Sequence, residues 1–595
     1  MALVRPVLTA PGVYVQEVPS GVHTVVGVST SVTAFIGRTT YGPVGEPTLI
    51  TSFEDFERTF GGLKKDSLTT YAIQDFFLNG GTQAIVIRAF NDGGDGAMGR
   101  TGAVTFRAAD PLALDNAQKA VDKATAKVTA AEDAKTAADK ALKDAGSDSA
   151  KKKKAQAEQK TAEAALTKAQ AELKTATDAQ TALKAQHTDP QWKLVASSPG
   201  AWGGRVYYNV EDVTSPLVQA RYKTPDWDAK DLKNLTIYYV QETGGETVEH
   251  FPNVSTNAKA GHRSVSEVLK YTSRFARVLG AKDTAGTAKA SDPLSPGDYE
   301  EALEALDKVD IFNLLCIPPD VREGDTAPDV YTEAVSLCEK RRATLIVDPP
   351  SAWGTSTPPE NITPEDFSSD LGISAGATSA RFAAVYFPRI IKPDPLNAGY
   401  PAQFCASGLI AGVYAKNDGA RGVWKAPAGL DTGLLGVSKL EHKLTDAQNG
   451  FMNQRGINAL RSFPDSGPVI WGARTMRGAD SLSDDYKYVP VRRLADYIEE
   501  SLKRGSKWAV FEPNDEPLWA QLRQSVGAFM FDLFRQGAFQ GVTKDQAYFV
   551  KCDSSTTTQN DIDAGIVNVV VGFAPLKPAE FVILYFQQIA GNIQA

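Results

Sequence analysis

The 595-residue sequence has few cysteines and histidines and no long apolar segment. Its four cysteines lie far apart and form no CxxC pair, which argues against a disulfide framework or a zinc site and indicates buried thiols in a reducing compartment. The five histidines are scattered, without the spacing of metal ligands. Because no run of about 18 apolar residues occurs, no transmembrane helix is expected. Pro6 and Pro11 interrupt the short apolar start of the chain, so we expect no signal peptide.

The remaining composition is that of an ordinary globular protein. It is 42% hydrophobic and 23% charged, and the length allows roughly three to five domains. The 63 basic and 71 acidic residues give a formal net charge of −8. This balance argues against a dedicated nucleic-acid binder. We therefore expect no nucleic-acid partner and no direct insertion into a membrane.

One segment differs from the rest of the chain. Residues 113–187 contain 24 alanines and 14 lysines, no proline and no aromatic residue, and Gly146 is their only glycine, a composition that favours helix. Apolar residues recur there in alternating steps of three and four, at Leu114, Ala117, Val121, Ala124, Val128 and Ala131, and again at Ala162, Leu166, Ala169, Leu173, Ala176 and Leu183. These heptad seams predict an antiparallel helical hairpin with arms roughly 45 Å long. We interpret Lys151–Lys154 as a solvated helix end and not as a nucleic-acid or membrane patch.

The sequence on both sides of this segment is typical of β structure. Alternating residues with Gly or Asn breaks, in GAVTFRAAD before it and in WKLVASSPGAWGGRVYYNV and NLTIYYVQE after it, predict a β domain that carries the hairpin as an insertion. Further along, IFNLLCIPP, the helical VYTEAVSLCEKRRA and TLIVDPP predict two buried strands joined by a helix. Such a βαβ unit belongs to a parallel sheet.

Two enzyme-like motifs lack the context that their chemistry needs. The GxGxxG string Gly94–Gly99 is followed by a strand pattern, TGAVTFRA, and not by the helix N-terminus that would bind a pyrophosphate. The GxSxG string Gly372–Gly376 follows a polar segment, and the nearest downstream histidine is His442. We interpret both as loops, and we expect no catalytic residue, no cofactor and no metal.

Short β-forming segments occur near both ends of the sequence. Val13, Tyr14 and Val15 lie between two prolines and are too few to fold alone. Near the other end an apolar run of six residues would aggregate if its edge stayed exposed. Its members are Phe581, Val582, Ile583, Leu584, Tyr585 and Phe586. Each segment must pair within the subunit or add as a strand to another chain.

Many strings of the sequence resemble contractile tail sheath proteins of myophages and of the related contractile injection systems. In the first part they are PGVYVQEVPSG, STSVTAFIGRTTYGPVGEPTLITSFEDFERTFGG and AIQDFFLNGGTQAIVIRAF. In the second part they are GVYAKNDGARGVWKAPAG, GINALRSFP, VIWGARTM, YVPVRRLADYIEESL, WAVFEPNDEPLW, AYFVKCDSSTT and PAEFVILYFQQ. Together they cover residues 11–90 and roughly 300–590, in the order of the family. Residues 100–290 lie where the family is variable.

The resemblance implies a multidomain α/β fold with nested insertions. A conserved α/β sheath core would be completed by inter-subunit β-strand exchange, and a β-rich outer domain would carry the α-helical coiled-coil hairpin. The expected division is an N-terminal extended arm (1–25), a middle α/β domain (26–98 and 298–400), an outer β-rich insertion (99–111 and 189–297), the helical hairpin (112–188), an inner conserved domain (401–575) and a C-terminal arm strand (576–595).

The resemblance also implies a function and a set of partners. The subunit would polymerise helically with itself around an inner tube and contract to drive that tube through a target envelope. The other expected partners are baseplate proteins and terminator or cap proteins. The protein would assemble in the bacterial cytoplasm and then form part of a phage tail or of an injection particle. In such a polymer the two end segments would leave their subunit and complete a neighbour's sheet.

Two other functions remain open from the residues alone. One is a hydrolase that uses the Gly372–Gly376 loop, and the other is a non-contractile assembly or adhesion protein such as a capsid or surface-layer subunit. A further hypothesis concerns the inner tube. Lys503, Arg504 and Lys507 at the end of a predicted helix are favourable there because of the helix dipole. They are also our candidates for contact with acidic groups of the tube.

Overall fold

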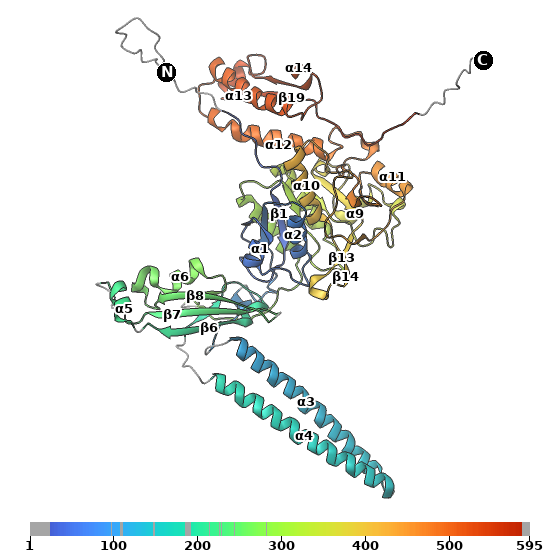
Figure 1. Ribbon diagram of the computed structural model, residues 1–595. Coiled ribbons are helices and arrows are strands. Elements are labelled where there is room, and N and C mark those ends of the chain that lie inside the picture. The colour runs from blue at the N-terminus through green and yellow to red at the C-terminus, as the bar shows by residue number, and fades with distance from the viewer. Residues whose placement is uncertain are drawn as a thin grey trace, which may run out of the picture.

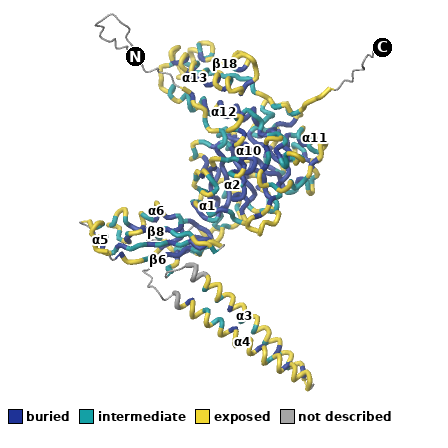
Figure 2. Tube along the Cα trace, in the orientation of Figure 1, coloured by how far each residue is buried: buried dark blue, intermediate teal, exposed yellow. Residues whose placement is uncertain are grey.

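The computed structural model describes residues 24–585 except 97, 108–110, 147–148, 185–191, 214, 225–226, 228, 243 and 281–282. Figure 1 shows three parts in a row, with a central body between a C-terminal unit (residues 489–575) and a β-rich insertion. A long helical hairpin projects from the insertion. The buried residues concentrate in the body, as Figure 2 shows.

The body is built on an eight-stranded sheet with the order β17-β16-β12-β11-β10-β1-β3-β2. These strands are β1 (Thr33–Gly37), β2 (Thr48–Ile50), β3 (Ala84–Arg88), β10 (Leu314–Cys316), β11 (Thr344–Val347), β12 (Ala383–Phe387), β16 (Asn458–Phe463) and β17 (Gly467–Ile470). The six inner strands are parallel, and β2 and β17 pair antiparallel at the two edges. The predicted strand–helix–strand unit is present, because α8 (Pro328–Arg341) connects the parallel strands β10 and β11.

Helices cover both faces of this sheet, which explains why its central strands are continuous apolar runs. On one face Phe35 and Val86 pack with α1 (Phe53–Phe60), α2 (Leu68–Leu78) and α10 (Ser407–Arg421). On the other face the neighbouring positions Ile36 and Ile85 pack with α7 (Pro296–Ala305), α8 and α9 (Asp366–Leu371). The body is completed by α11 (Asp446–Gln454) and by a small sheet of β13 (Ile390–Pro393), β14 (Pro401–Phe404) and β15 (Lys439–Leu440).

The structure corrects the boundary that the sequence analysis drew between residues 400 and 401. Strand β16 pairs with β12, and α10 packs on the same face of the sheet as α2. Residues 401–488 therefore share one core with the middle domain. A second core begins with α12 (Val489–Gly505), whose Leu494 and Ile498 pack with α13 (Glu516–Arg535) and Val25. The C-terminal unit also holds α14 (Lys544–Ala547), β18 (Tyr548–Lys551), α15 (Gln559–Asp563) and β19 (Val570–Phe573).

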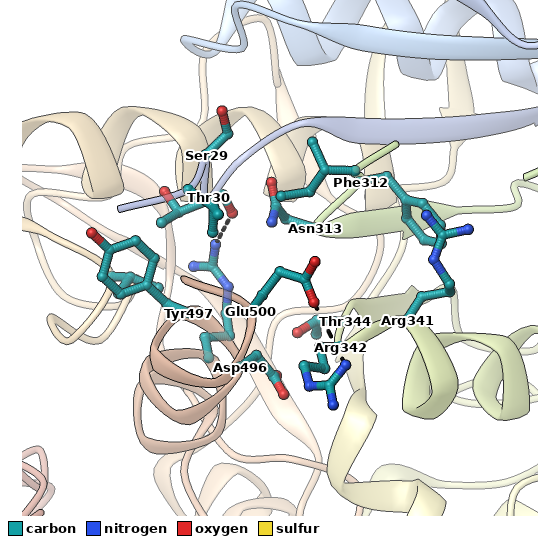
Figure 3. A pocket seen from close by; sticks show the side chains of 14 residues that line it. Ser29, Thr30, Phe312, Asn313, Arg341, Arg342, Thr344, Asp496, Tyr497 and Glu500 are labelled. Atoms are coloured by element: carbon teal, nitrogen blue, oxygen red, sulfur yellow. Dashed lines mark hydrogen bonds and ion pairs between the residues drawn. The ribbon is translucent and has the colours of Figure 1, made fainter. Parts of the chain in front are cut away.

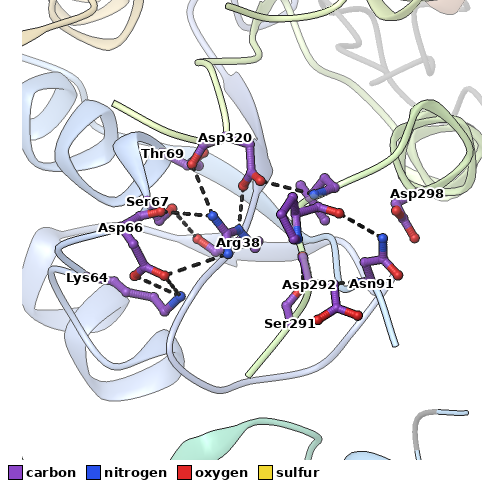
Figure 4. Close-up of polar contacts among 12 residues, drawn as sticks. Arg38, Lys64, Asp66, Ser67, Thr69, Asn91, Ser291, Asp292, Asp298 and Asp320 are labelled. Carbon is purple, nitrogen blue, oxygen red and sulfur yellow. Dashed lines mark hydrogen bonds and ion pairs between the residues drawn. The ribbon is translucent and has the colours of Figure 1, made fainter. Parts of the chain in front are cut away.

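The β-rich insertion leaves and re-enters the body at one point. Asn91 and Asp292 form an antiparallel bridge, and the Asn91 N–H also bonds to Ser291 Oγ at 3.0 Å. Figure 4 shows this base beside Arg38, whose Nε lies 2.5 Å from Asp320 Oδ1. The insertion contains a sheet of β4 (Thr105–Phe106), β6 (Val206–Asp212), β7 (Lys233–Val240) and β8 (Glu246–Val254), the pair β5 (Leu194–Ala196) and β9 (Ala276–Val278), and helices α5 (Pro216–Tyr222) and α6 (Val265–Thr272).

The Ala/Lys-rich segment forms two long helices, α3 (Pro111–Asp144) and α4 (Ser149–Lys184). Gly146 takes a positive φ of 51° in the turn between them, a conformation that favours glycine. The Lys127 Nζ–Glu172 Oε2 ion pair (2.7 Å) joins the two antiparallel helices at their surface. Ala124, Ala162 and Ala169, three of the predicted seam positions, are buried where the helices meet. The outer faces are exposed, as Figure 2 shows.

We expect the hairpin to be dispensable for polymerisation, because its described Val and Leu side chains are partly buried between its own two helices. Replacing residues 112–188 with a short Gly/Ser linker should leave the length of the assembled particles and their contraction unchanged. Negative-stain electron microscopy of wild-type and linker proteins prepared side by side would measure both. Loss of assembly would show that the hairpin makes a contact in the lattice.

Candidate functional site

The motifs with enzyme-like spacing lie in loops. Ser374 is exposed in the turn that follows α9, and His442 stacks on Phe387 with ring centroids 5.7 Å apart. Gly94–Gly99 leads into a short 3₁₀ turn and then into β4, not into an α-helix. In the parts of the chain that the structure describes, no group of three His, Cys, Asp or Glu side chains is arranged to hold a metal ion. No described helix is long and apolar enough to cross a membrane.

The C-terminal arm carries the most exposed apolar segment of the described chain. Phe581–Tyr585 are between 70% and 90% exposed. Among the described residues no strand pairs with this segment, and Figure 1 shows it leading away from the body. An extended apolar segment of this kind is suited to pair with another chain. Phe586 lies outside the described residues, and so do Val13, Tyr14 and Val15 of the predicted N-terminal strand.

The C-terminal unit contains a two-stranded sheet that sequence reasoning did not single out. Strands β18 and β19 pair antiparallel over Tyr548–Lys551 and Val570–Phe573, and in the described structure no further strand joins them. One face, with Tyr548 and Val571, packs on the core around α13. The other face leaves Phe549 half-exposed. The signal was present in the sequence as the β-forming runs AYFVK and VNVVVGF.

Both outer edges of this two-stranded sheet offer hydrogen-bonding groups. The N–H of Ala574 donates to the carbonyl of Ala547 at 2.8 Å, just beyond the paired strands. Bonded and non-bonded pairs alternate along an antiparallel ladder. Val550–Val571 is the third pair after the bonded Ala547–Ala574 pair, so it is a non-bonded pair. The backbone N–H and C=O groups of both residues therefore point away from the partner strand. Two strands alone are marginally stable in water, so these edges are suited to accept further strands.

Helix α12 joins the C-terminal unit to the body through buried charges. Arg493 pairs with Asp418 of α10 at 2.6 Å, and both side chains are nearly fully buried. Arg493 also donates to the carbonyl of Thr30 at 2.8 Å. Figure 3 shows the small cavity beside this contact, where Glu500 approaches Arg342 at 3.5 Å. Burial raises the pKa of Asp496 to about 7 although Arg492 lies 2.8 Å away.

The three cations proposed to contact the inner tube lie at the end of α12 and just beyond it. Arg504 is engaged within the subunit, because it pairs with Asp310 at 2.6 Å and with Glu500 at 2.8 Å. Lys503 is exposed and approaches Glu500 only at 3.9 Å. Lys507 is also exposed. The structure thus gives Arg504 a local role and leaves Lys503 and Lys507 at the surface.

Two family models match adjacent parts of the chain. The model for the phage tail sheath protein central domain matches residues 292–476, and the model for the phage tail sheath C-terminal domain matches residues 481–589. Residues 292–476 and 481–589 therefore belong to the phage tail sheath family. The matches cover most of the body and all of the C-terminal unit, with its two-stranded sheet and the exposed apolar segment.

Individual relatives agree with this family. The tail sheath protein of Enterobacteria phage T4 is 28% identical over 180 residues, and that of Vibrio phage KVP40 is 26% identical over 181 residues. Each match covers 30% of this chain and 26% of the relative, so the chain matches about a quarter of the length of these proteins. The sheath complex of an extracellular contractile injection system (PVC) in its contracted state has a similar fold. Its TM-score is 0.52 at 20% identity, over 98% of this chain and 99% of that one.

Proposed function

We propose that this chain is the structural subunit of a contractile sheath, which polymerises helically around an inner tube and shortens to drive the tube through a target envelope. The observation that carries the proposal is the presence of a strand donor and a strand acceptor on one subunit. The donor is the exposed segment Phe581–Tyr585, and the acceptor is the β18–β19 sheet with its unpaired edges. A donor and an acceptor at different places make head-to-tail contacts, which propagate as a helical polymer when the rotation between neighbours does not close a ring.

Strand exchange would also explain how a sheath changes length without falling apart. The strand that each subunit gives to a neighbour connects the two subunits while their bodies rotate and repack. The extended lattice would be metastable relative to the contracted one, so that the energy is stored at assembly and released when the baseplate triggers contraction. The proposal needs no catalytic residue and no cofactor.

The proposed partners follow from this role. They are further copies of the chain, the inner tube protein, and the baseplate and terminator proteins at the two ends of the sheath. We place assembly in the bacterial cytoplasm and the finished subunit in a phage tail or in an injection particle. The predicted N-terminal strand (Val13–Val15) would be the second donated strand, on the other edge of the acceptor sheet.

The test is reconstitution. The full chain expressed with its tube protein should form tube-filled helical particles that exist in two lengths, a long one at assembly and a short, wide one after triggering with mild urea or acid. Cryo-electron microscopy would show whether the C-terminal segment enters the β18–β19 sheet of a neighbour. Filaments or sheets with a single lattice state would favour a non-contractile assembly protein. A protein that stays monomeric and does not bind the tube would contradict the proposal.

The contact with the tube can be tested separately at Lys503 and Lys507. Changing both to Glu should block co-assembly with the tube, because the new carboxylates would repel acidic groups on it. Arg504 is left unchanged because it pairs with Asp310 within the subunit. Changing Lys259 and Lys270 of the insertion to Glu gives the same change in net charge and is the matched control. Normal tube-filled sheaths from the Lys503/Lys507 variant would eliminate this contact.

A further inference from the structure

The C-terminal arm is fastened to the body just before its exposed segment begins. Glu580 forms a two-point ion pair with Arg474, with Arg474 Nε 2.7 Å from Oε1 and Nη2 2.5 Å from Oε2. Asn453 Nδ2 lies 3.5 Å from the same carboxylate. The Arg474 side chain is 1% exposed. Bidentate pairs of this type are strong and directional.

Arg474 is itself held rigidly by the body. Its N–H donates to Asn458 Oδ1 at 2.7 Å, and Asn458 Nδ2 donates back to the Arg474 carbonyl at 2.8 Å. Asn458 is fully buried at the start of β16. The guanidinium also bonds to the Gly478 carbonyl and to Asp480, at 3.2 and 2.9 Å. Glu580 is therefore tied to the eight-stranded sheet, and not to the C-terminal unit that precedes it in sequence.

The rest of the described arm is attached weakly. Upstream, the last backbone hydrogen bonds of the described arm join Ala574 to Ala547 and to Gln540. Between Leu576 and Tyr585, Glu580 is the one described residue for which a side-chain hydrogen bond or ion pair is seen. Pro578 and Phe581 line a groove together with Trp471 and Tyr488 of the body. Burial raises the pKa of Glu580, but the hydrogen bonds and charge of Arg474 outweigh it and hold this pKa below its usual range, so the carboxylate is charged at neutral pH.

We infer that the Arg474–Glu580 ion pair anchors the donated strand to the body of its own subunit. The inference rests on the proposed function, because it concerns how the proposed donor strand is held. The ion pair fixes where and in which direction the strand leaves. It also directs tension from a neighbouring subunit into the eight-stranded sheet. Arg474 and Glu580 are thus positioning residues for strand exchange.

The alternative path for tension is mechanically weak. Without the anchor, the strand would be connected to Ala574 only through residues 575–580, six residues that reach about 20 Å when fully extended. The tension would then act on β19, which is paired over four residues with β18 alone. A free tether also lowers the effective concentration of the strand at the neighbour's acceptor edge. Loss of the anchor should therefore affect both assembly and the integrity of the sheath during contraction.

The test compares Glu580→Ala and Glu580→Gln with wild type in the full chain. Lys577→Ala is the matched control, since Lys577 is an exposed arm residue with no ion pair in the described structure. We expect Glu580→Ala to raise the protein concentration needed for sheath assembly at least tenfold and Glu580→Gln to have an intermediate effect. Sheaths that form at high concentration should break into short pieces when contraction is triggered. Lys577→Ala should behave as wild type.

A spin label reports on the anchor without any assembly. The four native cysteines are buried, so Ala579→Cys can be labelled selectively, and we expect the label to become more mobile when Glu580→Ala is added. If the unlabelled wild-type protein fails to form sheaths with the tube, the proposed function fails, while the mobility of the label still decides whether the anchor exists. Unchanged mobility, or normal assembly and contraction by Glu580→Ala, overturns the inference. A lowered melting temperature with normal assembly of the folded fraction would assign the pair a purely structural role, which also overturns it.

Discussion

A protein that lacks residues 581–595 is expected to fold as a monomer with cooperative melting and to form no sheath. The deleted side chains that the structure describes are mostly exposed, so the deletion removes little of the subunit's own core. On a neighbour's sheet, burying each large apolar side chain would contribute about 1.5–3 kcal/mol, and all of this would be lost. Circular dichroism melting, sedimentation velocity and electron microscopy with the tube protein measure fold, mass and assembly.

Two further deletions sharpen this first result. Removing residues 579–595 also removes Glu580, so a difference in melting between the two truncated proteins reports the contribution of the Arg474 pair. Removing residues 1–20 tests the predicted N-terminal strand and should likewise spare the fold and abolish assembly. Long contractile tubes from any of these proteins would show that the strand concerned does not connect subunits.

The body could be predicted from the sequence largely because its strands are buried on both faces. The runs IFNLLCIPP and TLIVDPP became β10 and β11 with α8 between them, as parallel strands require. The seam of the hairpin could also be predicted, because its apolar residues recur at the spacing of a helix and the residues between them are polar or small. In both cases local pattern and tertiary environment agree.

What the sequence did not reveal depends on contacts between residues far apart in the chain. The boundary placed at residue 400 failed because β16 pairs with β12 more than 70 positions earlier, and no local pattern in GINALRSFP specifies that partner. The role of Arg504 changed for the same reason, since Asp310 approaches it from a distant loop. The ion pair of Arg474 with Glu580 joins positions that differ by 106 in sequence. Periodicity cannot report such pairs.

A proline at Val550 is expected to abolish sheath assembly while leaving the subunit folded. The alternation of bonded pairs directs the Val550 N–H away from β19, so proline removes a donor that serves only an added strand. Proline is tolerated at such edge positions. Val550→Ala is the matched control, because it removes the same side-chain packing and keeps the N–H group. We expect the alanine variant to assemble and the proline variant to remain monomeric, with melting temperatures within about 5 °C of each other.

The same pair of substitutions at Val571 tests the outer edge of β19. If the two predicted arms occupy the two edges, proline at either position should block polymerisation, because every subunit must accept both strands to continue the lattice. If proline is harmless at one of the two positions, only the other edge accepts a strand. The protein that lacks the arm proposed for the unused edge should then assemble as well. Normal assembly of both proline variants would remove β18 and β19 as the acceptor, since strand addition to an edge requires its outward N–H groups.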